Sequence, residues 1–217
     1  MCLKVLAATT PSSAEPATTP SSGGAGNDIL RSGAGKDSID GGLGQDRWVA
    51  DYNGSELDIV IKFRPEPDTL ATNWAGTAPS TTASVKNIEH VTLYTGNGED
   101  RISTEFLESD DDIRTRDGDD EVHVGDGRDY ADGAGGNDTL RMDWSQSTTN
   151  ITKPAYYLYD DGASNRLEYW GFEFYDVTGG AGNDTLNGGA GGDAIDGGDG
   201  VDLWQANYGS ETDGMSL

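Results

Sequence analysis

The chain has 217 residues, of which 39 are Asp or Glu and 14 are Lys or Arg, so its formal net charge is −25 at pH 7. This sign of charge disfavours nucleic acid as a partner, and no apolar stretch approaches the roughly 18 residues of a membrane span. Cys2 is the only cysteine, which excludes an intrachain disulfide.

The first 22 residues differ in composition from the rest. Residues 1–22 are rich in Thr, Ser, Pro and Ala and are expected to form a disordered arm. Their apolar stretch, Leu3–Ala8, is short and interrupted by Lys4, which is not typical of a secretory signal peptide.

Three copies of one nonapeptide follow the arm, over residues 23–49, with the pattern Gly-Gly-x-Gly-x-Asp-x-U-x, where U is apolar. The pattern recurs five times over residues 95–141, with two residues inserted after the first copy, and three times over residues 179–205. Eleven copies in register do not arise from glycine-rich composition alone. A flexible acidic linker, the usual interpretation of such composition, has no reason to keep this period.

The glycines and the acid of each copy have separate roles. Glycine adopts positive φ without a Cβ penalty, so the first four positions form a tight turn whose carbonyls can point inward. The acid places a carboxylate at the end of that turn. Ca²⁺ takes six to eight oxygen ligands, which carbonyls and carboxylates from two stacked turns together can provide.

The candidate calcium ligands are therefore the sixth-position acids and the turn glycines. The acids are Asp28, Asp37, Asp46, Asp100, Asp111, Asp120, Asp129, Asp138, Asp184, Asp193 and Asp202. The glycines are Gly24, Gly26, Gly33, Gly35, Gly42, Gly44, Gly118, Gly127, Gly180, Gly182, Gly189, Gly191, Gly198 and Gly200.

The x-U-x triplet after each turn predicts a short strand with its central side chain inward. These inward residues are Leu30, Ile39, Trp48, Ile102, Ile113, Val122, Ala131, Leu140, Leu186, Ile195 and Trp204. Trp48 and Trp204 are expected to close their runs as core residues.

Two inserts separate the runs. Residues 51–95 contain two predicted strands, Leu57–Phe63 and Asn87–Tyr94, with a Thr/Pro/Ala-rich loop between them. Residues 142–178 contain two aromatic runs around Asp-Asp-Gly-Ala-Ser-Asn, which predicts a hairpin. Residues 46–59 and 138–151 also resemble each other at an offset of 92. Trp74, Trp144 and Trp170 lie in these inserts and are expected to pack the roll, with sugar stacking as the alternative.

The nonapeptide resembles the hemolysin-type calcium-binding repeat of the RTX family. The resemblance implies an all-β fold, a parallel β-roll in which successive repeats alternate between two sheets. It implies calcium between a turn and the turn two repeats later. Four such pairs of turns lie inside uninterrupted runs, and a fifth follows if the two-residue insertion is absorbed. It also implies export from a bacterium by a type I pathway, which reads an uncleaved C-terminal signal. The tail Asp213–Leu217, an acid followed by apolar residues, resembles such a signal only faintly.

Catalytic motifs are absent from the sequence. The two histidines, His90 and His123, fall in predicted strands, and neither a His-Glu-x-x-His nor a Gly-x-Ser-x-Gly motif occurs. We therefore expect no enzyme activity.

The divisions expected are the arm (1–22), run one with its strand insert (23–94), run two with its aromatic hairpin (95–178), and run three with the tail (179–217). The function expected is a secreted or cell-surface protein that folds on meeting calcium and serves as a structural or assembly component, with end-to-end homo-oligomers among its partners. A carbohydrate-binding accessory module, with a polysaccharide as partner, and a fragment of a larger secreted toxin, enzyme or adhesin are the alternatives.

Overall fold

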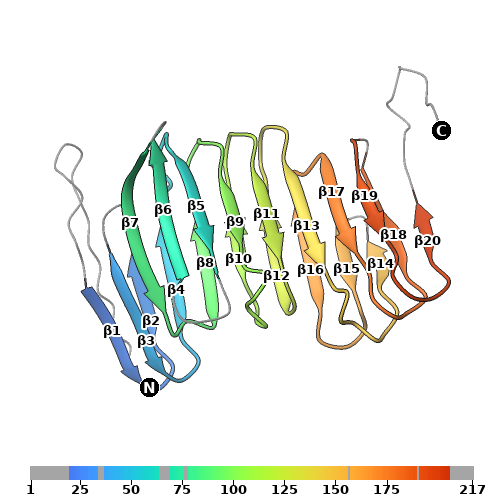
Figure 1. Cartoon of the computed structure of the whole chain (residues 1–217), viewed down its shortest axis with the longest axis horizontal. Coiled ribbons are helices and arrows are strands. Elements are labelled where there is room, and N and C mark those ends of the chain that lie inside the picture. The colour runs from blue at the N-terminus through green and yellow to red at the C-terminus, as the bar shows by residue number, and fades with distance from the viewer. Residues whose placement is uncertain are drawn as a thin grey trace.

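The protein is a two-sheet roll of parallel strands, viewed in Figure 1 across its long axis. A computed structural model describes residues 20–33, 37–63, 69–75, 78–155, 157–189 and 191–205. These residues form twenty strands and no helix, and consecutive repeat strands alternate between the sheets. The fold is the all-β parallel roll that the resemblance to the RTX repeat implies.

The strands form a ten-stranded, an eight-stranded and a two-stranded sheet. In spatial order the ten-stranded sheet consists of β1 (Pro20–Ala25), β3 (Ser38–Leu43), β7 (Ala78–Lys86), β6 (Thr69–Ala75), β5 (Asp58–Lys62), β9 (Arg101–Ser103), β11 (Glu121–Val124), β13 (Thr139–Asp143), β17 (Phe174–Thr178) and β19 (Ala194–Asp196). The eight-stranded sheet consists of β14 (Thr152–Ala155), β15 (Leu158–Asp160), β16 (Arg166–Trp170), β12 (Arg128–Asp132), β10 (Asp112–Arg114), β8 (His90–Tyr94), β4 (Arg47–Asp51) and β2 (Ile29–Ser32). The two-stranded sheet consists of β18 (Thr185–Asn187) and β20 (Leu203–Gln205), with β18 beside β14.

The nine-residue period sets the pairing of the strands. Within the repeat runs each strand pairs in parallel with the strand two repeats later, so β10 pairs with β12 and β11 with β13. The pair β9 and β11 contains the two-residue insertion and is still in register, with Ile102 opposite Val122. The insertion is therefore accommodated between β9 and β10 without a shift in register. This is the condition under which a fifth pair of stacked turns was expected.

The core is a row of side chains from the U positions of the repeats. Those from Leu30 to Leu186 in the chain are at most 3% exposed, and Trp48 is completely buried, with its Nε1–H donating to Ser32 Oγ at 2.9 Å. Ile195 is only partly buried. Trp204 is 53% exposed, so the prediction that it is a core residue is wrong within the described part of the chain, where β20 has a neighbour on one side only.

Each insert adds three strands to one sheet. The chain leaves β4, forms β5 alongside the later strand β9, and returns through antiparallel β6 and β7 to pair with the earlier strand β3. Strands β14, β15 and β16 form a similar antiparallel unit at the edge of the eight-stranded sheet, where β14 lies beside the later strand β18 and β16 pairs in parallel with the earlier strand β12. The predicted hairpin is confirmed as β15 and β16.

The loop predicted between Phe63 and Asn87 is wrong over β6 and β7, which are strands. Backbone pairing to β5 and β3 on either side outweighs the Thr, Ala, Ser and Pro composition that suggested a loop. Among the tryptophans of the inserts, Trp144 is completely buried and Trp170 is 46% exposed, its ring 4.2 Å from that of Tyr157. The side chain of Trp74 lies outside the described residues.

The predicted arm ends earlier than expected, because residues 20–22 already belong to β1, which pairs with β3. Residues 1–19 and the tail 213–217 lie outside the described residues. The division of the chain into four segments stays a prediction. In the part that the structure describes, no helix is long and apolar enough to cross a membrane.

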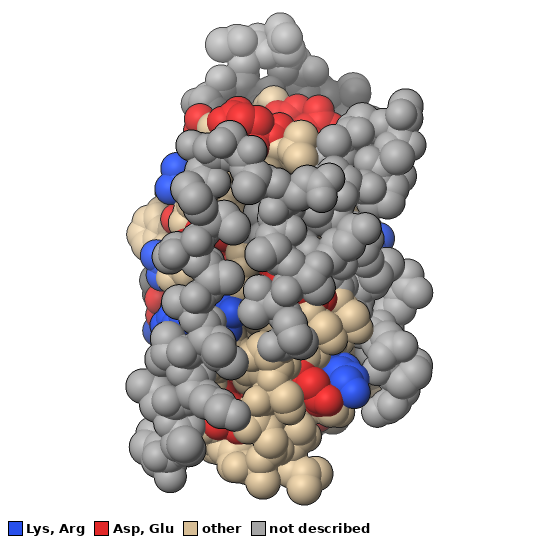
Figure 2. Space-filling view, turned by 90° about the vertical axis from the view of Figure 1, so that its left-hand side faces the viewer, with Lys and Arg blue, Asp and Glu red and all other residues tan. Residues whose placement is uncertain are grey.

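Charge is sorted by position on the roll. The sixth-position acids stand in the turns, at the edges where the strands end, and most Lys and Arg of the strands project from the outer faces of the sheets. These basic residues are Lys62, Lys86, Arg101 and Arg141 on the ten-stranded sheet and Arg47, Arg114, Arg128 and Arg166 on the eight-stranded sheet. Figure 2 looks along the roll from the end that carries β1 and shows red acidic atoms at the upper edge and blue basic atoms along the left flank.

Candidate metal centres

The repeat turns stack into ladders along the two edges of the roll. The turns that lead into the eight-stranded sheet form the first ladder, and those that lead into the ten-stranded sheet form the second. The first ladder carries Asp28, Asp46, Asp111 and Asp129, the second carries Asp37, Asp100, Asp120, Asp138 and Asp193, and a short ladder into β18 and β20 carries Asp184 and Asp202.

Neighbouring turns of a ladder are joined through their acids. The backbone N–H of the sixth-position Asp donates to Oδ1 of the Asp two repeats later. The five joined pairs are Asp28 to Asp46 (2.8 Å), Asp100 to Asp120 (2.8 Å), Asp111 to Asp129 (3.0 Å), Asp120 to Asp138 (2.9 Å) and Asp184 to Asp202 (2.9 Å). These are the four pairs of turns expected from uninterrupted runs together with the fifth that depended on the absorbed insertion. The number of ions bound stays a prediction.

The second carboxylate oxygen differs among these acids: that of Asp184 accepts the N–H of Gly180 at 3.2 Å, whereas most of the others have no hydrogen-bond partner. Oδ2 is buried and unpartnered in six of them: Asp28, Asp46, Asp100, Asp120, Asp129 and Asp138. A buried carboxylate without a compensating partner is strongly unfavourable, and proteins pair such a charge or place a metal beside it. The six orphaned oxygens fit a row of cations between the turns.

The glycines bring the backbone of successive turns close together. Gly44 and Gly118 have φ of 143°, which L side chains rarely adopt. A Cβ added to Gly44 would lie 2.3 Å from the carbonyl oxygen of Gly26, and one added to Gly118 would lie 2.1 Å from that of Gly98. Carbonyl oxygens of one turn therefore face the next turn of the ladder, where Cβ atoms would block them.

The first glycine of a repeat makes room for the carboxylate itself. A Cβ added to Gly23 would lie 2.7 Å from Oδ2 of Asp28, and one added to Gly179 would lie 2.5 Å from Oδ2 of Asp184. Among the described residues no three His, Cys, Asp or Glu side chains gather at one point. A cation in a ladder would therefore take most of its ligands from backbone carbonyls, and an all-oxygen ligand set is typical of calcium.

Most of the predicted glycines occupy these stacked turns. Besides Gly44 and Gly118, positive φ occurs at Gly24, Gly26, Gly42, Gly127, Gly198 and Gly200. The backbone does not have positive φ at Gly33, Gly180, Gly182, Gly189 and Gly191. Gly35 lies outside the described residues. Which of these carbonyls bind metal stays a prediction.

Burial raises the pKa of several of the ladder acids above the ordinary value of 3.8. The pKa is raised to about 6 for Asp120, to about 7 for Asp100, Asp111 and Asp138, and to about 9 for Asp129. For Asp129 the negative charge of Asp111 is the second cause after burial. The turns thus hold their carboxylates where the charged form is disfavoured unless a cation stands beside them.

The sequence did not predict several other participants in the ladders, among them Val91 and Tyr175, whose N–H groups donate to Oδ1 of Asp111 and Asp193 at 3.0 Å each. The N–H of Ile59 donates to Asp100 Oδ1 at 2.7 Å and that of Ile151 to Asp184 Oδ1 at 2.8 Å, so the first strand of each insert replaces a repeat. Glu89 and Glu173 accept N–H groups at the return from each insert. The offset of 92 between residues 46–59 and 138–151 pointed to the two isoleucines, but the glutamates follow no nine-residue period.

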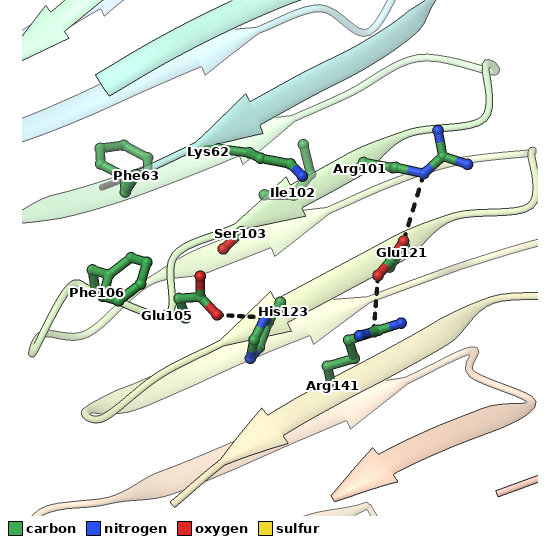
Figure 3. Close-up of a pocket in the computed structure, with 10 residues that line it drawn as sticks. All are labelled: Lys62, Phe63, Arg101, Ile102, Ser103, Glu105, Phe106, Glu121, His123 and Arg141. Atoms are coloured by element: carbon green, nitrogen blue, oxygen red, sulfur yellow. Dashed lines mark ion pairs between the residues drawn. The ribbon is translucent and has the colours of Figure 1, made fainter. Parts of the chain in front are cut away.

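A second candidate site is a groove of about 270 Å³ on the outer face of the ten-stranded sheet, drawn in Figure 3. Glu121 lies between two guanidinium groups, with its carboxylate 3.5 Å from Nε of Arg101 and 2.8 Å from Nε of Arg141. His123 contacts Glu105 at 2.8 Å. Lys62 also lines the groove and forms no ion pair with another described residue. This small basic patch contrasts with the acidic charge of the chain.

The comparisons with known proteins bear on the ladders. The family model of the RTX calcium-binding nonapeptide repeat, in four copies, matches residues 22–47, 108–140 and 176–203. These segments overlap the three repeat runs and contain ten of the eleven sixth-position acids, all except Asp100. No curated protein matches the chain.

Proposed function

Because the chain carries RTX calcium-binding nonapeptide repeats, we propose that it is a secreted protein that folds on meeting extracellular calcium. Its role is structural: it is a component of a filament, surface layer or matrix and has no catalysis of its own. The observation that carries this proposal is the row of buried, unpartnered Oδ2 atoms in the stacked turns.

Without a cation, two forces oppose the folded state. The six orphaned oxygens lose their hydration on folding, and the net charge of −25 repels itself more strongly in a compact roll. An ion that binds only the folded state contributes about 2.7 kcal/mol per site at a hundredfold excess over its dissociation constant. Four or five such sites together contribute roughly 11 to 14 kcal/mol, which is the size of the whole stability of a typical domain.

Extracellular modules bind calcium with dissociation constants on the order of 10⁻⁴ to 10⁻³ M. Sites of that strength stay empty at cytosolic calcium and fill outside the cell. Folding is thereby postponed until after export, which suits a chain that must leave the cell unfolded.

The assembly part of the proposal is supported by the last described rung of the roll. Among the described strands, β20 pairs with β18 alone, and it exposes Leu203 and Trp204 at 53% each, next to Val201 at 81%. Unpaired strand edges with apolar side chains favour pairing with another chain. A second copy, approaching with its own terminal rung, has the matching period.

Size-exclusion chromatography with light scattering across a calcium titration tests both parts together, with circular dichroism of the same samples in calcium and in EDTA. We expect an expanded monomer in EDTA, compaction with β signal on adding calcium, and a mass that increases with protein concentration once calcium is bound. A compact roll in EDTA would refute calcium-driven folding. A mass that stays monomeric at all concentrations would refute assembly.

A carbohydrate-binding role is the second candidate, favoured by the groove at Lys62, Arg101 and Arg141. The Lys62 ammonium, which forms no ion pair with another described residue, and the two guanidinium groups on either side of Glu121 suit the carboxylates of an anionic polysaccharide. Calorimetry with polygalacturonate at fixed calcium tests it. Lys62→Gln should weaken binding and Lys86→Gln, which alters the ion pair with Asp40 outside the groove, should not; equal binding by both variants would exclude the groove as the site.

A further inference from the structure

The returns from the two inserts lie at the edges of the roll where the sequence has no repeat. Before β8 the chain reads Asn87-Ile88-Glu89, and before β17 it reads Gly171-Phe172-Glu173. Asn87 and Gly171 both have positive φ, 53° and 71°, and the apolar residue that follows each is buried. Three residues therefore make a turn where the repeat uses six.

Each glutamate accepts the hydrogen bond that a sixth-position Asp accepts elsewhere. The N–H of Asp46 donates to Glu89 Oε2 at 2.8 Å, and the N–H of Asp138 donates to Glu173 Oε2 at 2.9 Å. In an ordinary pair the N–H of Asp28 donates to Asp46 Oδ1 at 2.8 Å. The extra methylene of glutamate extends the carboxylate from the shorter turn to the same place in the ladder.

The backbone carbonyls correspond as well. A Cβ added to Gly41 would lie 1.9 Å from the carbonyl oxygen of Asn87, and one added to Gly133 would lie 2.3 Å from that of Gly171. In an ordinary pair, a Cβ on Gly23 would lie 2.5 Å from the carbonyl oxygen of Gly41. Both short turns thus present a carbonyl where a repeat presents the carbonyl of its first glycine.

The two acids next to the short turns each have a carboxylate oxygen that accepts no hydrogen bond. Asp46 and Asp138 are completely buried, and Oδ2 of each has no hydrogen-bond partner. Each stands beside the negative charge of its glutamate. Each glutamate thus adds a second negative charge beside a buried carboxylate oxygen that has no partner, and a bound cation would compensate both charges.

We propose that Glu89 and Glu173 are calcium ligands, each completing with Asp46 or Asp138 a site that the nonapeptide pattern does not contain. The first ladder then continues from Asp46 across the return of the first insert, and the second ladder continues from Asp138 across the return of the second. The inference rests on the proposed calcium-dependent folding and adds one ion per insert to the ions held between repeats.

A purely structural role of the two glutamates and a role in binding calcium predict different effects of substitution. If the glutamates serve only as acceptors for the N–H groups of Asp46 and Asp138, glutamine should replace them without loss, since its side-chain oxygen accepts the same bond. If they bind calcium, glutamine removes the charge that the site needs. The variants Glu89→Gln and Glu173→Gln therefore separate the two roles.

The test is the number of calcium ions bound per chain, measured by equilibrium dialysis on the full chain at saturating calcium. Glu168→Gln is the matched control, because Glu168 projects from β16 and is paired with Arg166 away from the turns. We expect each single variant to bind one ion fewer than the control and the double variant two fewer. Equal numbers in all variants would overturn the inference while leaving the proposed function intact. A native chain that binds no calcium would overturn both.

A second measurement uses only the native chain and therefore tests the inference even if a variant fails to fold. Crystals of the native chain grown with calcium and soaked in terbium should give anomalous peaks between Asp46 and Glu89 and between Asp138 and Glu173. Peaks between repeat turns with none at these two places would refute the inference without any substitution.

Discussion

The Asp129 carboxyl leads to a prediction whose sign depends on calcium. Its Oδ1 accepts the N–H of Asp111 at 3.0 Å, while Oδ2 is buried without a partner. Asparagine keeps the acceptor and removes the charge. We expect Asp129→Asn to stabilise the roll in the absence of calcium and to destabilise it in the presence of calcium.

The structure sets the size of both effects. Burial raises the pKa of Asp129 to about 9 from the ordinary value of 3.8, so at pH 7 the metal-free roll forms only by protonating a group that is ionised in the unfolded chain. The pH lies about 3 units above the ordinary pKa, and each unit is about 1.4 kcal/mol, so this penalty is at most about 4 kcal/mol. Asparagine removes it. With calcium, the variant loses much of one ion's contribution, about 3 kcal/mol at a hundredfold excess.

Folding without calcium is driven by adding trimethylamine oxide in EDTA, since this osmolyte favours burial. Asp129→Asn should need less osmolyte than the native chain, and in calcium it should unfold at lower urea concentration. Asp176→Asn, on the exposed outer face of the ten-stranded sheet, should shift neither midpoint appreciably. If Asp129→Asn folds less readily than the native chain under both conditions, the carboxylate is not held at an energetic cost, and the argument for a cation in the ladder fails.

Three further outcomes follow from the same geometry. Trp48→Ala removes a completely buried indole and should destabilise the calcium-bound roll by about 3 to 5 kcal/mol in urea unfolding, whereas Trp170→Ala, at a site 46% exposed, should cost clearly less. Gly44→Ala should raise the calcium concentration at the folding midpoint, because φ is 143° and the added Cβ would lie 2.3 Å from the carbonyl oxygen of Gly26. Gly54→Ala should not, because its Cβ would meet no atom within 4 Å. In EDTA, acidification from pH 8 to pH 5 should promote compaction seen by light scattering: the folded-state pKa values of about 6 to about 9 lie above the unfolded value of 3.8, so the roll gains stability as pH falls through that interval. Compaction that weakens with acidification would contradict the assignment of these acids.

The repeats could be predicted from the sequence because every structural requirement recurs at the same offset. An acid such as Asp120 and an apolar residue such as Val122 return every nine residues, and the turn, the strand and the inward side chain follow from local chemistry. The parallel pairing of β11 with β13, two repeats later, is what the resemblance to the RTX repeat implies.

The inserts could be predicted only in part, because their structure depends on partners far along the chain. Strand β6 has a Thr- and Ala-rich composition and is a strand because β5 and β7 lie on either side of it. Glu89 accepts the N–H of an acid that lies 43 residues earlier in the chain, Asp46. Trp204 has the sequence position of Trp48 but not its surroundings, since Trp48 stands between two neighbouring strands and Trp204 beside one. Such differences are properties of the assembled roll and leave no local signal.

The two inserts also indicate which part of this fold is constrained. They enter opposite sheets and share little of their strand sequences, yet their entrance turns make equivalent bonds: Ser55 N–H to Tyr52 O at 2.8 Å, and Ser147 N–H to Trp144 O at 2.9 Å. Each entrance is followed by an isoleucine N–H bonded to a ladder acid, and each return ends in a glutamate bonded to the preceding one. Three strands can be added to either sheet provided that the chain bonds to a ladder acid both where the insert begins and where it ends. The edges, where the carboxylates and carbonyls converge, therefore constrain the roll more tightly than the apolar interior, as the proposed calcium-dependent folding implies.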